Sequence, residues 1–371
     1  MKLTAKVKLL TDETQRAALL ETMERVNQAC DWVSKQAWKA QEFRQYSLHA
    51  LVYPALREKF GLPSQIAARC IAKVADAYKL DKKTKRTFRI YGSIGYDSRI
   101  LGWNVSSQTV SIRGLHKRLK IRFAAGDRQL AQLANQRGES DLIYQRGEFY
   151  LAATCDVAEP ERVNPAAFLG VDLGVAEIAS TSDGLRRSGA VVKGVRHRHR
   201  RLRRKLQKIG TPAAKRRLKL LSGKESRFAR HVNHIISKQI VATAKGTDRG
   251  IAVEELTGIR NRVTVRKSQR AVLHSWAFAQ LRAFLVYKAI LAGVLLLAVD
   301  PRNTSRECSK CGHVDKRNRP NQSTFRCLAC EHAEHADINA ARVIADRATS
   351  KLAEGGSARL SELCSSTHSV S

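Results

Sequence analysis

Three acidic residues and two cysteine pairs are the side chains in this sequence whose types and spacing could do chemistry. Asp172 and Glu254 each end a short apolar run, and Asp337 comes shortly after the second cysteine pair. Carboxylates drawn from distant segments can hold two divalent cations roughly 3.5–4 Å apart, which clamp the attacking and leaving oxygens when a phosphodiester bond is broken. We therefore expect these acids to form a site for two Mg²⁺ or Mn²⁺ ions.

Each of the three acids also has an ordinary structural explanation. A single Asp beside glycine is usually a turn residue, and an Asp in the first turn of a helix is usually a cap. Glu254 is followed by Glu255, and successive side chains of a strand point to opposite faces, so only one of them can join Asp172. The pattern leaves open which one does. Asp300, at the end of another apolar run, is the main competing candidate.

The cysteine pairs have the spacing of a structural zinc site. The motif is Cys308-x2-Cys311 and Cys327-x2-Cys330, with fifteen residues between the pairs. Four thiolates in this pattern surround one Zn²⁺ tetrahedrally and leave no open position, so the zinc is structural. The other cysteines, at positions 30, 70, 155 and 364, are isolated in sequence and offer no disulfide framework. We interpret them as buried or incidental thiols.

Composition points to a polyanionic partner. The chain has 67 Lys plus Arg against 33 Asp plus Glu and a formal net charge of +34, which favours nucleic acid. The longest apolar run, residues 289–299, is too short to span a bilayer, and the N-terminus lacks the apolar region of a signal peptide. We expect a protein of the cytoplasm, associated with the nucleoid, with no membrane partner.

Residues 196–230 concentrate the positive charge. This stretch holds fifteen Lys or Arg and a single acid, Glu225. A charge run is usually a solvated helix face, but like charges one turn apart repel each other unless phosphates neutralise them. The predicted nucleic-acid contacts are Arg200, Arg201, Arg203, Arg204, Lys215, Arg216 and Arg217, with Arg69 and Lys73 on an N-terminal helix.

The order of periodicities indicates a multidomain α+β protein. Residues 1–10 and 84–160 alternate with period two and predict a β-barrel, while residues 11–83 have helical spacing. Residues 161–302 and 335–350 predict a mixed α/β core, including long basic helices from about 196 to 244 and a helix over 274–292. Residues 303–334 hold the zinc motif. The Ser- and Gly-rich tail, residues 351–371, is expected to be disordered.

As a set, these motifs resemble the TnpB family of transposon-encoded proteins, which is related to compact type V CRISPR effectors. The resemblance rests on Gly170-Val-Asp-Leu-Gly174, Val253-Glu-Glu-Leu256, residues 274–288 and 299–305, both cysteine pairs, and His335-Ala-Asp-Ile-Asn339. It covers most of the chain. Two positions depart from the family pattern: Glu331 stands where glycine is common, and Asn303 stands where an aromatic residue is common.

The resemblance implies an RNA-guided DNA endonuclease. Its implied fold is a RuvC-like (RNase H-like) core with a zinc-ribbon insertion, plus an N-terminal wedge barrel that carries a helical recognition insert. It implies that Asp172, Glu254 and Asp337 are the metal ligands, which selects Glu254 over Glu255. It also implies a guide RNA from the flanking locus and double-stranded target DNA beside a short flanking motif, bound by a monomer with its RNA.

Three other functions remain open from the sequence. The first is a guided DNA-binding protein that does not cleave, which the intact set of acids disfavours. The second is a transposition accessory or strand-transfer protein acting on transposon ends. The third is a zinc-ribbon nucleic-acid-binding protein without enzyme activity, which would leave Asp172 and Glu254 without a role.

Overall fold

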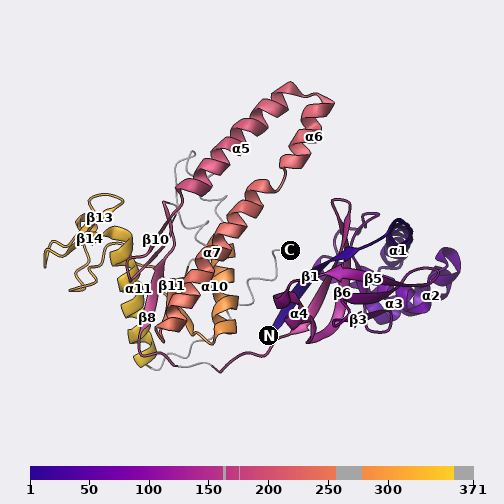
Figure 1. The fold of residues 1–371 in the computed structure, drawn as a ribbon, viewed down its shortest axis with the longest axis horizontal. Coiled ribbons are helices and arrows are strands. Elements are labelled where there is room, and N and C mark those ends of the chain that lie inside the picture. Colours follow the sequence, from indigo (N-terminus) through magenta and orange to yellow (C-terminus); the bar gives the residue numbers. More distant parts are fainter. Residues whose placement is uncertain (162–163, 175, 256–277, 355–371) are drawn as a thin grey trace. The chain divides into compact units, whose positions relative to one another are not determined.

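The computed structural model describes residues 1–161, 164–174, 176–255 and 278–354. The chain divides into two compact units, Met1–Ala158 and Glu159–Ser371, which are distinguished by colour in Figure 1. No helix in the described ranges has the length and apolar character needed to cross a membrane. The expectation of a multidomain chain that mixes helices and sheets is confirmed.

The first unit is built on a seven-stranded antiparallel sheet in the order β2-β6-β7-β1-β5-β4-β3. Its strands are β1 (Lys2–Leu10), β2 (Ile94–Tyr96), β3 (Leu101–Asn104), β4 (Thr109–Arg113), β5 (Arg118–Ala124), β6 (Gln136–Gln145) and β7 (Glu148–Asp156). A short helix, α4 (Asp127–Leu133), joins β5 to β6. Buried and exposed residues alternate strictly along β5, as period-two patterning requires. The Trp103 indole donates to the Ser140 hydroxyl at 3.3 Å, from β3 to β6, so the sheet coils strongly.

Three helices separate β1 from β2. They are α1 (Glu13–Ala40), α2 (Gln45–Phe60) and α3 (Ser64–Leu80). A capping box between Asp12 and Gln15 starts α1, because the Asp side chain satisfies a backbone N–H that has no partner within the helix. Gly61 ends α2 in the left-handed conformation. The apolar faces of the helices and the sheet share one core.

The second unit contains a five-stranded sheet in the order β10-β9-β8-β11-β12. Its strands are β8 (Phe168–Asp172), β9 (Glu177–Thr181), β10 (Arg186–Ser188), β11 (Gly250–Glu254) and β12 (Leu296–Val299). The strands β8, β11 and β12 are parallel, whereas β9 and β10 pair antiparallel. Helices α7 (Lys224–Gly246) and α10 (Phe278–Ala292) cover one face of the sheet, and α11 (Ala336–Ala353) packs on the other.

The long basic helical stretch consists of three helices. These are α5 (Ala190–Ile209), α6 (Pro212–Leu221) and α7. Gly210 ends α5 in the left-handed conformation, and the Thr211 side chain caps α6. Gly223, also left-handed, precedes α7. In Figure 1, α5 runs away from the sheet and α6 leads back to α7. We call α5, α6 and the first turns of α7 the arm.

The cysteine module lies between β12 and α11. It contains a 3-10 turn (Lys316–Asn318) and a two-stranded sheet of β13 (Thr324–Arg326) and β14 (Ala333–His335). Helix α11 continues to Ala353, beyond position 351 where the tail was expected to begin. The remainder of the expected tail, and residues 274–277 of the expected helix, lie outside the described residues.

Candidate active site and zinc module

Asp172 and Glu254 end neighbouring parallel strands on the same face of the sheet. Val171 pairs with Val253 in the β8–β11 register, so the two carboxylates follow at adjacent positions. The alternate residues Phe168 and Ala252 belong to the core under α11. Because side chains on a strand alternate between faces, Asp172 and Glu254 share that α11 face. This edge, where the parallel strands end, is where α/β sheets commonly place their functional groups.

A glycine allows α11 to bring Asp337 to this edge. A Cβ atom built on Gly170 would lie 1.8 Å from the Ala341 carbonyl oxygen, so the helix backbone rests directly on β8. Asp337 lies one helical turn before Ala341, in the first turn of α11, and the His335 side chain caps that helix. The side chain of Asp337 is only 14% exposed. The sequence-predicted acids thus converge from a strand end, a second strand end and a helix start.

The three carboxylates interact electrostatically. Burial is the main cause that raises the pKa of Asp172 to about 7, followed by the negative charges of Glu254 and Asp337. Burial also raises the pKa of Glu254, which hydrogen bonding from Thr304 partly offsets. Like charges held together in a partly buried place disfavour ionisation. A bound divalent cation would reverse that repulsion, so the donor set fits a metal site.

Two side chains at this edge were not anticipated from the sequence. Arg319, from the cysteine module, donates to a carboxylate oxygen of Asp337 at 2.8 Å. The hydroxyl of Thr304, which is buried, donates to Glu254. Both residues lie in irregular segments near the cysteine motif, where neither periodicity nor spacing indicates which way a side chain points.

The neighbouring acid Glu255 lies on the opposite face of the sheet. Both terminal nitrogens of the Arg282 guanidinium, on α10, donate hydrogen bonds to the Glu255 carboxylate oxygens, each with an N···O distance of 2.6 Å. Ile251 and Val253, which point to the same side of β11 as Glu255, belong to the core under α7 and α10. Glu255 therefore faces those two helices. The structure therefore brings Glu254, and not Glu255, to Asp172.

The four motif cysteines converge on one point. Their sulfur atoms all lie within 4.8 Å of one another, with Cys308 to Cys330 at 3.6 Å and Cys311 to Cys327 at 3.5 Å. Zn–S bonds of about 2.3 Å in a tetrahedron place the sulfurs about 3.8 Å apart. The spacing therefore fits one tetrahedral Zn²⁺, in agreement with the sequence motif.

The two cysteine turns have matching backbone bonds. In the first, the Gly312 N–H donates to the Cys308 carbonyl; in the second, Glu331 donates to the Cys327 carbonyl in the same way. Gly312 and Glu331 both have positive φ, 73° and 57°. The family's glycine after the fourth cysteine corresponds to this left-handed position.

A buried amide joins the cysteine module to α11. The Asn339 side chain donates to the Glu307 carbonyl at 2.7 Å and accepts from the Ser309 N–H at 3.0 Å. Asn339 is fully buried and lies two residues after Asp337. These hydrogen bonds therefore hold the cysteine module against the first turns of α11, which carry Asp337.

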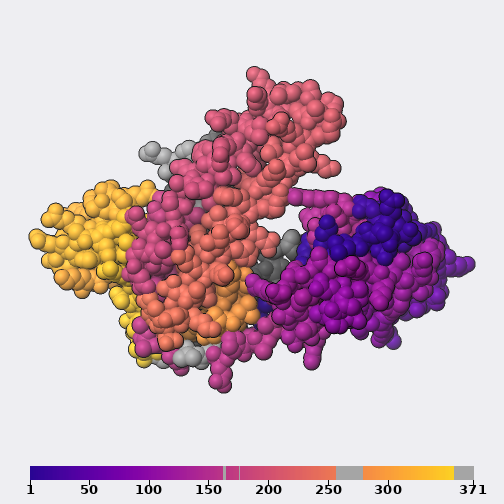
Figure 2. All heavy atoms as spheres, viewed as in Figure 1, coloured from indigo at the N-terminus to yellow at the C-terminus, as the bar shows by residue number. Residues whose placement is uncertain are grey.

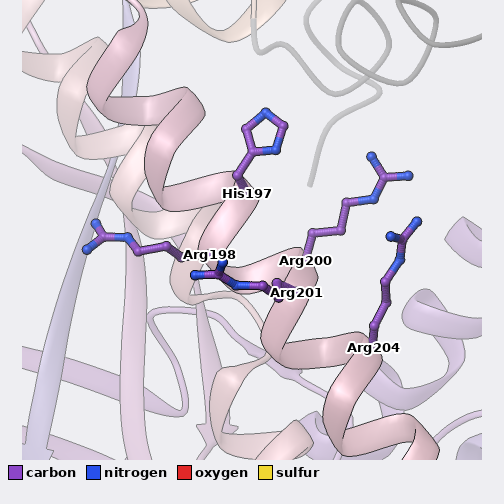
Figure 3. A pocket seen from close by; sticks show the side chains of 5 residues that line it. All are labelled: His197, Arg198, Arg200, Arg201 and Arg204. Carbon is purple, nitrogen blue, oxygen red and sulfur yellow. The ribbon is translucent and has the colours of Figure 1, made fainter.

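The arm presents exposed cations along α5. His197, Arg198, Arg200, Arg201 and Arg204 line a cavity of about 440 Å³, and Figure 3 shows Arg200 and Arg204 pointing the same way. In the part of the chain that the structure describes, Arg200, Arg201 and Arg204 have no carboxylate partner. In Figure 2 the arm stands out as a narrow projection of its unit.

The remaining predicted phosphate contacts divide into two groups. In α6, Lys215, Arg216 and Arg217 are exposed. Arg203 instead pairs with Glu225 at 3.1 Å, and Arg196 pairs with the same carboxylate at 3.0 Å, which braces α5 against α7.

The N-terminal candidates have partners within their own unit. Arg69 forms an ion pair with Glu139. Lys73 donates to the Asn27 side chain at 2.6 Å and to the Ser93 carbonyl at 2.7 Å. These contacts hold α3 against neighbouring segments, and a role of either residue in nucleic-acid binding stays a prediction.

Comparison with known proteins agrees with these features. The family described as "Cas12f1-like, TNB domain" matches residues 278–344, which span α10, β12, the cysteine module and the start of α11. The chain is 30% identical to the "CRISPR-associated endodeoxyribonuclease Cas12f1" of Sulfoacidibacillus thermotolerans, over 64% of this chain and 58% of that protein.

Two further relatives are named as an RNA-guided DNA endonuclease and as a TnpB-like protein. The chain is 27% identical to the "Putative RNA-guided DNA endonuclease InsQ" of Escherichia coli K12, over 53% of each chain. It is 31% identical to a TnpB-like protein of Methanocaldococcus jannaschii, over 38% of this chain and 52% of that protein. The chain is therefore similar to TnpB-like proteins and to compact CRISPR-associated nucleases. It spans about half the length of the curated relatives that it matches.

The fold of this chain matches that of a solved structure. A structure described as the Cas12f1-sgRNA-target DNA complex superposes with a TM-score of 0.61, over 88% of this chain and 82% of that one, at 16% identity. The mixed α/β core with an inserted cysteine module therefore has the fold seen in that structure.

Proposed function

We propose that this protein is a TnpB-like, RNA-guided DNA endonuclease whose cleavage site is the α11 face of the second unit. The observation that carries the proposal is the convergence of Asp172, Glu254 and Asp337 at one sheet edge, where burial, followed by the charges of the other two acids, raises the pKa of Asp172 to about 7. Three carboxylates held in this way destabilise the folded protein because they repel one another, so such an arrangement indicates a functional site that binds a ligand. The names of the curated relatives support the same activity.

Asp172, Glu254 and Asp337 would hold the catalytic cations, two Mg²⁺ or Mn²⁺ ions. When bound, such ions activate a water and stabilise the charge that develops on the phosphate during phosphodiester hydrolysis. The chain's own contribution is positional: Gly170 fixes the height of α11 over β8, and Thr304 orients the Glu254 carboxylate. Arg319 offsets part of the negative charge at Asp337.

The arm would bind the nucleic-acid backbone. In a guided nuclease, base pairing with the RNA reads the target sequence, and the protein holds the heteroduplex by its phosphates and reads a short flanking motif. The exposed cations of α5 and α6 suit that task because phosphate contacts need charge and not base recognition. The partners are a guide RNA from the flanking locus and double-stranded target DNA, bound by one copy of the chain in the nucleoid.

The remaining parts have supporting roles in this proposal. The four cysteines would bind one structural Zn²⁺, so that the module is rigid enough to support α11 through Asn339. The second unit would be the RuvC-like core. The coiled sheet of the first unit would be the wedge barrel, and α1–α3 its recognition insert.

The alternatives explain less of the observed geometry. A guided protein that binds without cutting, or a zinc-ribbon nucleic-acid-binding protein, gives no reason to gather three carboxylates at one half-buried edge. A strand-transfer protein would use the same carboxylates, but it would act on transposon ends without a guide.

Guidance by RNA can be tested directly. The chain should be expressed with its flanking DNA and purified, and any copurifying RNA should be sequenced. We expect one discrete RNA, and cleavage only of plasmids that match its guide segment. Purified protein that cuts or joins transposon ends without RNA would favour strand transfer, and a bound RNA with no cleavage of any matched target would favour the guided binder.

A further inference from the structure

Two cysteines that are 40 positions apart in sequence meet in the core of the first unit. The sulfur of Cys30, on α1, lies 3.2 Å from the sulfur of Cys70, on α3. Both residues are at most 1% exposed. The sequence indicated isolated thiols, because nothing in their spacing predicts that α1 and α3 pack face to face at these positions. A disulfide bond requires a sulfur separation of about 2.05 Å, so the pair needs to close by only about an ångström.

A small cavity lies beside this pair. It measures about 10 Å³, and its lining includes Cys70, Arg69 and Tyr96. A volume of this size holds about one water-sized molecule. Cys70 is the thiol of the pair that lines the cavity, so it is the sulfur that a small molecule would reach first.

Two polar atoms around the cavity lack hydrogen-bond partners. The Tyr96 hydroxyl and the Arg69 Nε have none within the described part of the chain, although Tyr96 is only 1% exposed. A buried polar group without a partner costs free energy, and such a group usually indicates a bound water or ligand. Burial raises the pKa of Tyr96, so at neutral pH its hydroxyl keeps its proton and can donate. The cavity is therefore suited to a small molecule with oxygen acceptors.

We propose that Cys30 and Cys70 form a dithiol that hydrogen peroxide oxidises to a disulfide, with peroxide reaching the Cys70 sulfur from the side of the cavity, where Tyr96 and Arg69 offer hydrogen-bond donors. The Cys70 sulfur attacks one peroxide oxygen, an S–O bond forms as the O–O bond breaks, and the departing hydroxide takes the thiol proton to leave as water. The Cys30 sulfur then attacks the Cys70 sulfur and expels the second oxygen as water. In total, two thiols and one peroxide give one disulfide and two waters.

The product would connect α1 to α3 covalently. The contact with Cys30, followed by burial, raises the pKa of the Cys70 thiol, so the reactive thiolate is scarce and the reaction is slow at neutral pH. A cross-link between these helices restrains the unfolded chain and stabilises the folded one. Oxidation would thus stiffen the helical part of the first unit without touching the carboxylates or the zinc module.

The test uses the intact 371-residue chain with zinc bound. It is treated with hydrogen peroxide, alkylated in denaturant, digested without reduction and analysed by mass spectrometry. We expect a Cys30–Cys70 linked peptide that dithiothreitol separates, together with a higher melting temperature. Cys155 is the matched control, because it is buried in the same unit but does not line the cavity, and it should stay alkylatable. Folded protein whose other cysteines oxidise while Cys30 and Cys70 stay reduced would overturn the proposal.

Variants then test the order of events and the cavity. In Cys30→Ser, dimedone should trap a sulfenic acid on Cys70, whereas in Cys70→Ser the Cys30 thiol should stay reduced. Tyr96→Phe keeps the ring and removes the hydroxyl, so disulfide formation should slow severalfold. Sulfenic acid on Cys30 in the Cys70→Ser protein would reverse the order, and an unchanged rate in Tyr96→Phe would overturn the role of the cavity. The wild-type cross-link stands as a test even if a variant fails to fold.

Discussion

The pKa of Asp172 is strongly shifted by its surroundings in the candidate site. Its pKa is raised to about 7, first by burial and then by the charges of Glu254 and Asp337. At neutral pH it is therefore about half protonated in protein without metal. In the unfolded chain its pKa would be near 3.8, the ordinary value for an aspartate, so between pH 3.8 and about 7 the folded state holds the extra proton.

This shift predicts how metal binding depends on pH. A cation requires ionised Asp172, so below pH 7 binding must release a proton, and the affinity should rise by about tenfold per pH unit before it levels off. Mg²⁺ should therefore raise the melting temperature of the protein more at pH 8 than at pH 6. Asp172→Asn removes the titrating group and should remove the difference. Equal Mg²⁺ shifts at both pH values in the wild-type protein would contradict the assignment.

Glu331 has a left-handed backbone that its side chain disfavours. Its φ is 57° and its side chain is exposed, whereas the matching turn of the first cysteine pair has glycine at φ 73°. Glu331→Gly should therefore stabilise the zinc-loaded module by roughly 0.5–1 kcal/mol, because glycine adopts positive φ without strain. Chelator titration followed by circular dichroism would measure it. The matched change Gly312→Ala should destabilise, and a stabilising effect there would refute the backbone explanation.

Sequence reasoning identified the candidate acids and left their surroundings open. Strand alternation showed that Glu254 and Glu255 must separate, but only the packing of α10, which carries Arg282, shows which face each acid takes. Arg319 and Thr304 could not be found, because their positions depend on irregular backbone around the cysteine module.

The packing of α11 on β8 brings the acids of the candidate site together. Gly170 leaves no room for a side chain against the Ala341 carbonyl. Because Asp172 and Asp337 lie on either side of this contact, any separation of the two elements would move the carboxylates apart.

Gly170→Ala should therefore damage both stability and activity. The new methyl would overlap a backbone oxygen that cannot rotate away, and the cost should reach about 3 kcal/mol or more. Denaturant unfolding would measure it. Gly194→Ala is the matched control, since this residue in α5 has nothing within 4 Å of its Cβ position, and alanine there should stabilise by roughly 0.5–1 kcal/mol. A Gly170→Ala protein as stable as the wild type would refute the close packing.

The elements themselves were largely predictable, and their junctions less so. Period-two and helical spacing indicated most of the described strands and helices of both units, but not α4, which interrupts the predicted β region. The basic stretch was expected to contain long helices, but the bounds of α5, α6 and α7 were not predicted, although Gly210, Pro212 and Gly223 are turn signals in the sequence. The meeting of Cys30 and Cys70 depends on helix packing, which one sequence does not specify.

Across the whole molecule, the excess of positive charge is the property that bears most on nucleic-acid binding. The formal net charge is +34, and the arm carries exposed cations on both α5 and α6. Such charge binds phosphates with an affinity that falls as salt rises.

Neutralising the arm should flatten that salt dependence. Replacing Arg200, Arg201 and Arg204 by Gln should reduce the slope of log affinity against log salt by roughly 0.7–0.9 for each lost contact, for any guide sequence. Filter binding at several salt concentrations would measure it. The control is Lys82, Lys83 and Lys85→Gln, which makes the same charge change at exposed residues of the other unit. Equal slopes in the two variants would mean that the arm contributes only general charge.

In the proposed mechanism, the carboxylates on the α11 face hold the cations that cut DNA. The most direct measurement is cleavage of a matched plasmid by RNA-loaded protein carrying Asp172→Ala, compared with Glu255→Gln. We predict that Asp172→Ala abolishes cleavage but still binds the target, because it removes a metal ligand and leaves the arm intact. Glu255→Gln, on the opposite face, should still cut. A cutting Asp172→Ala protein, or a Glu255→Gln protein that folds and binds but does not cut, would contradict the assignment.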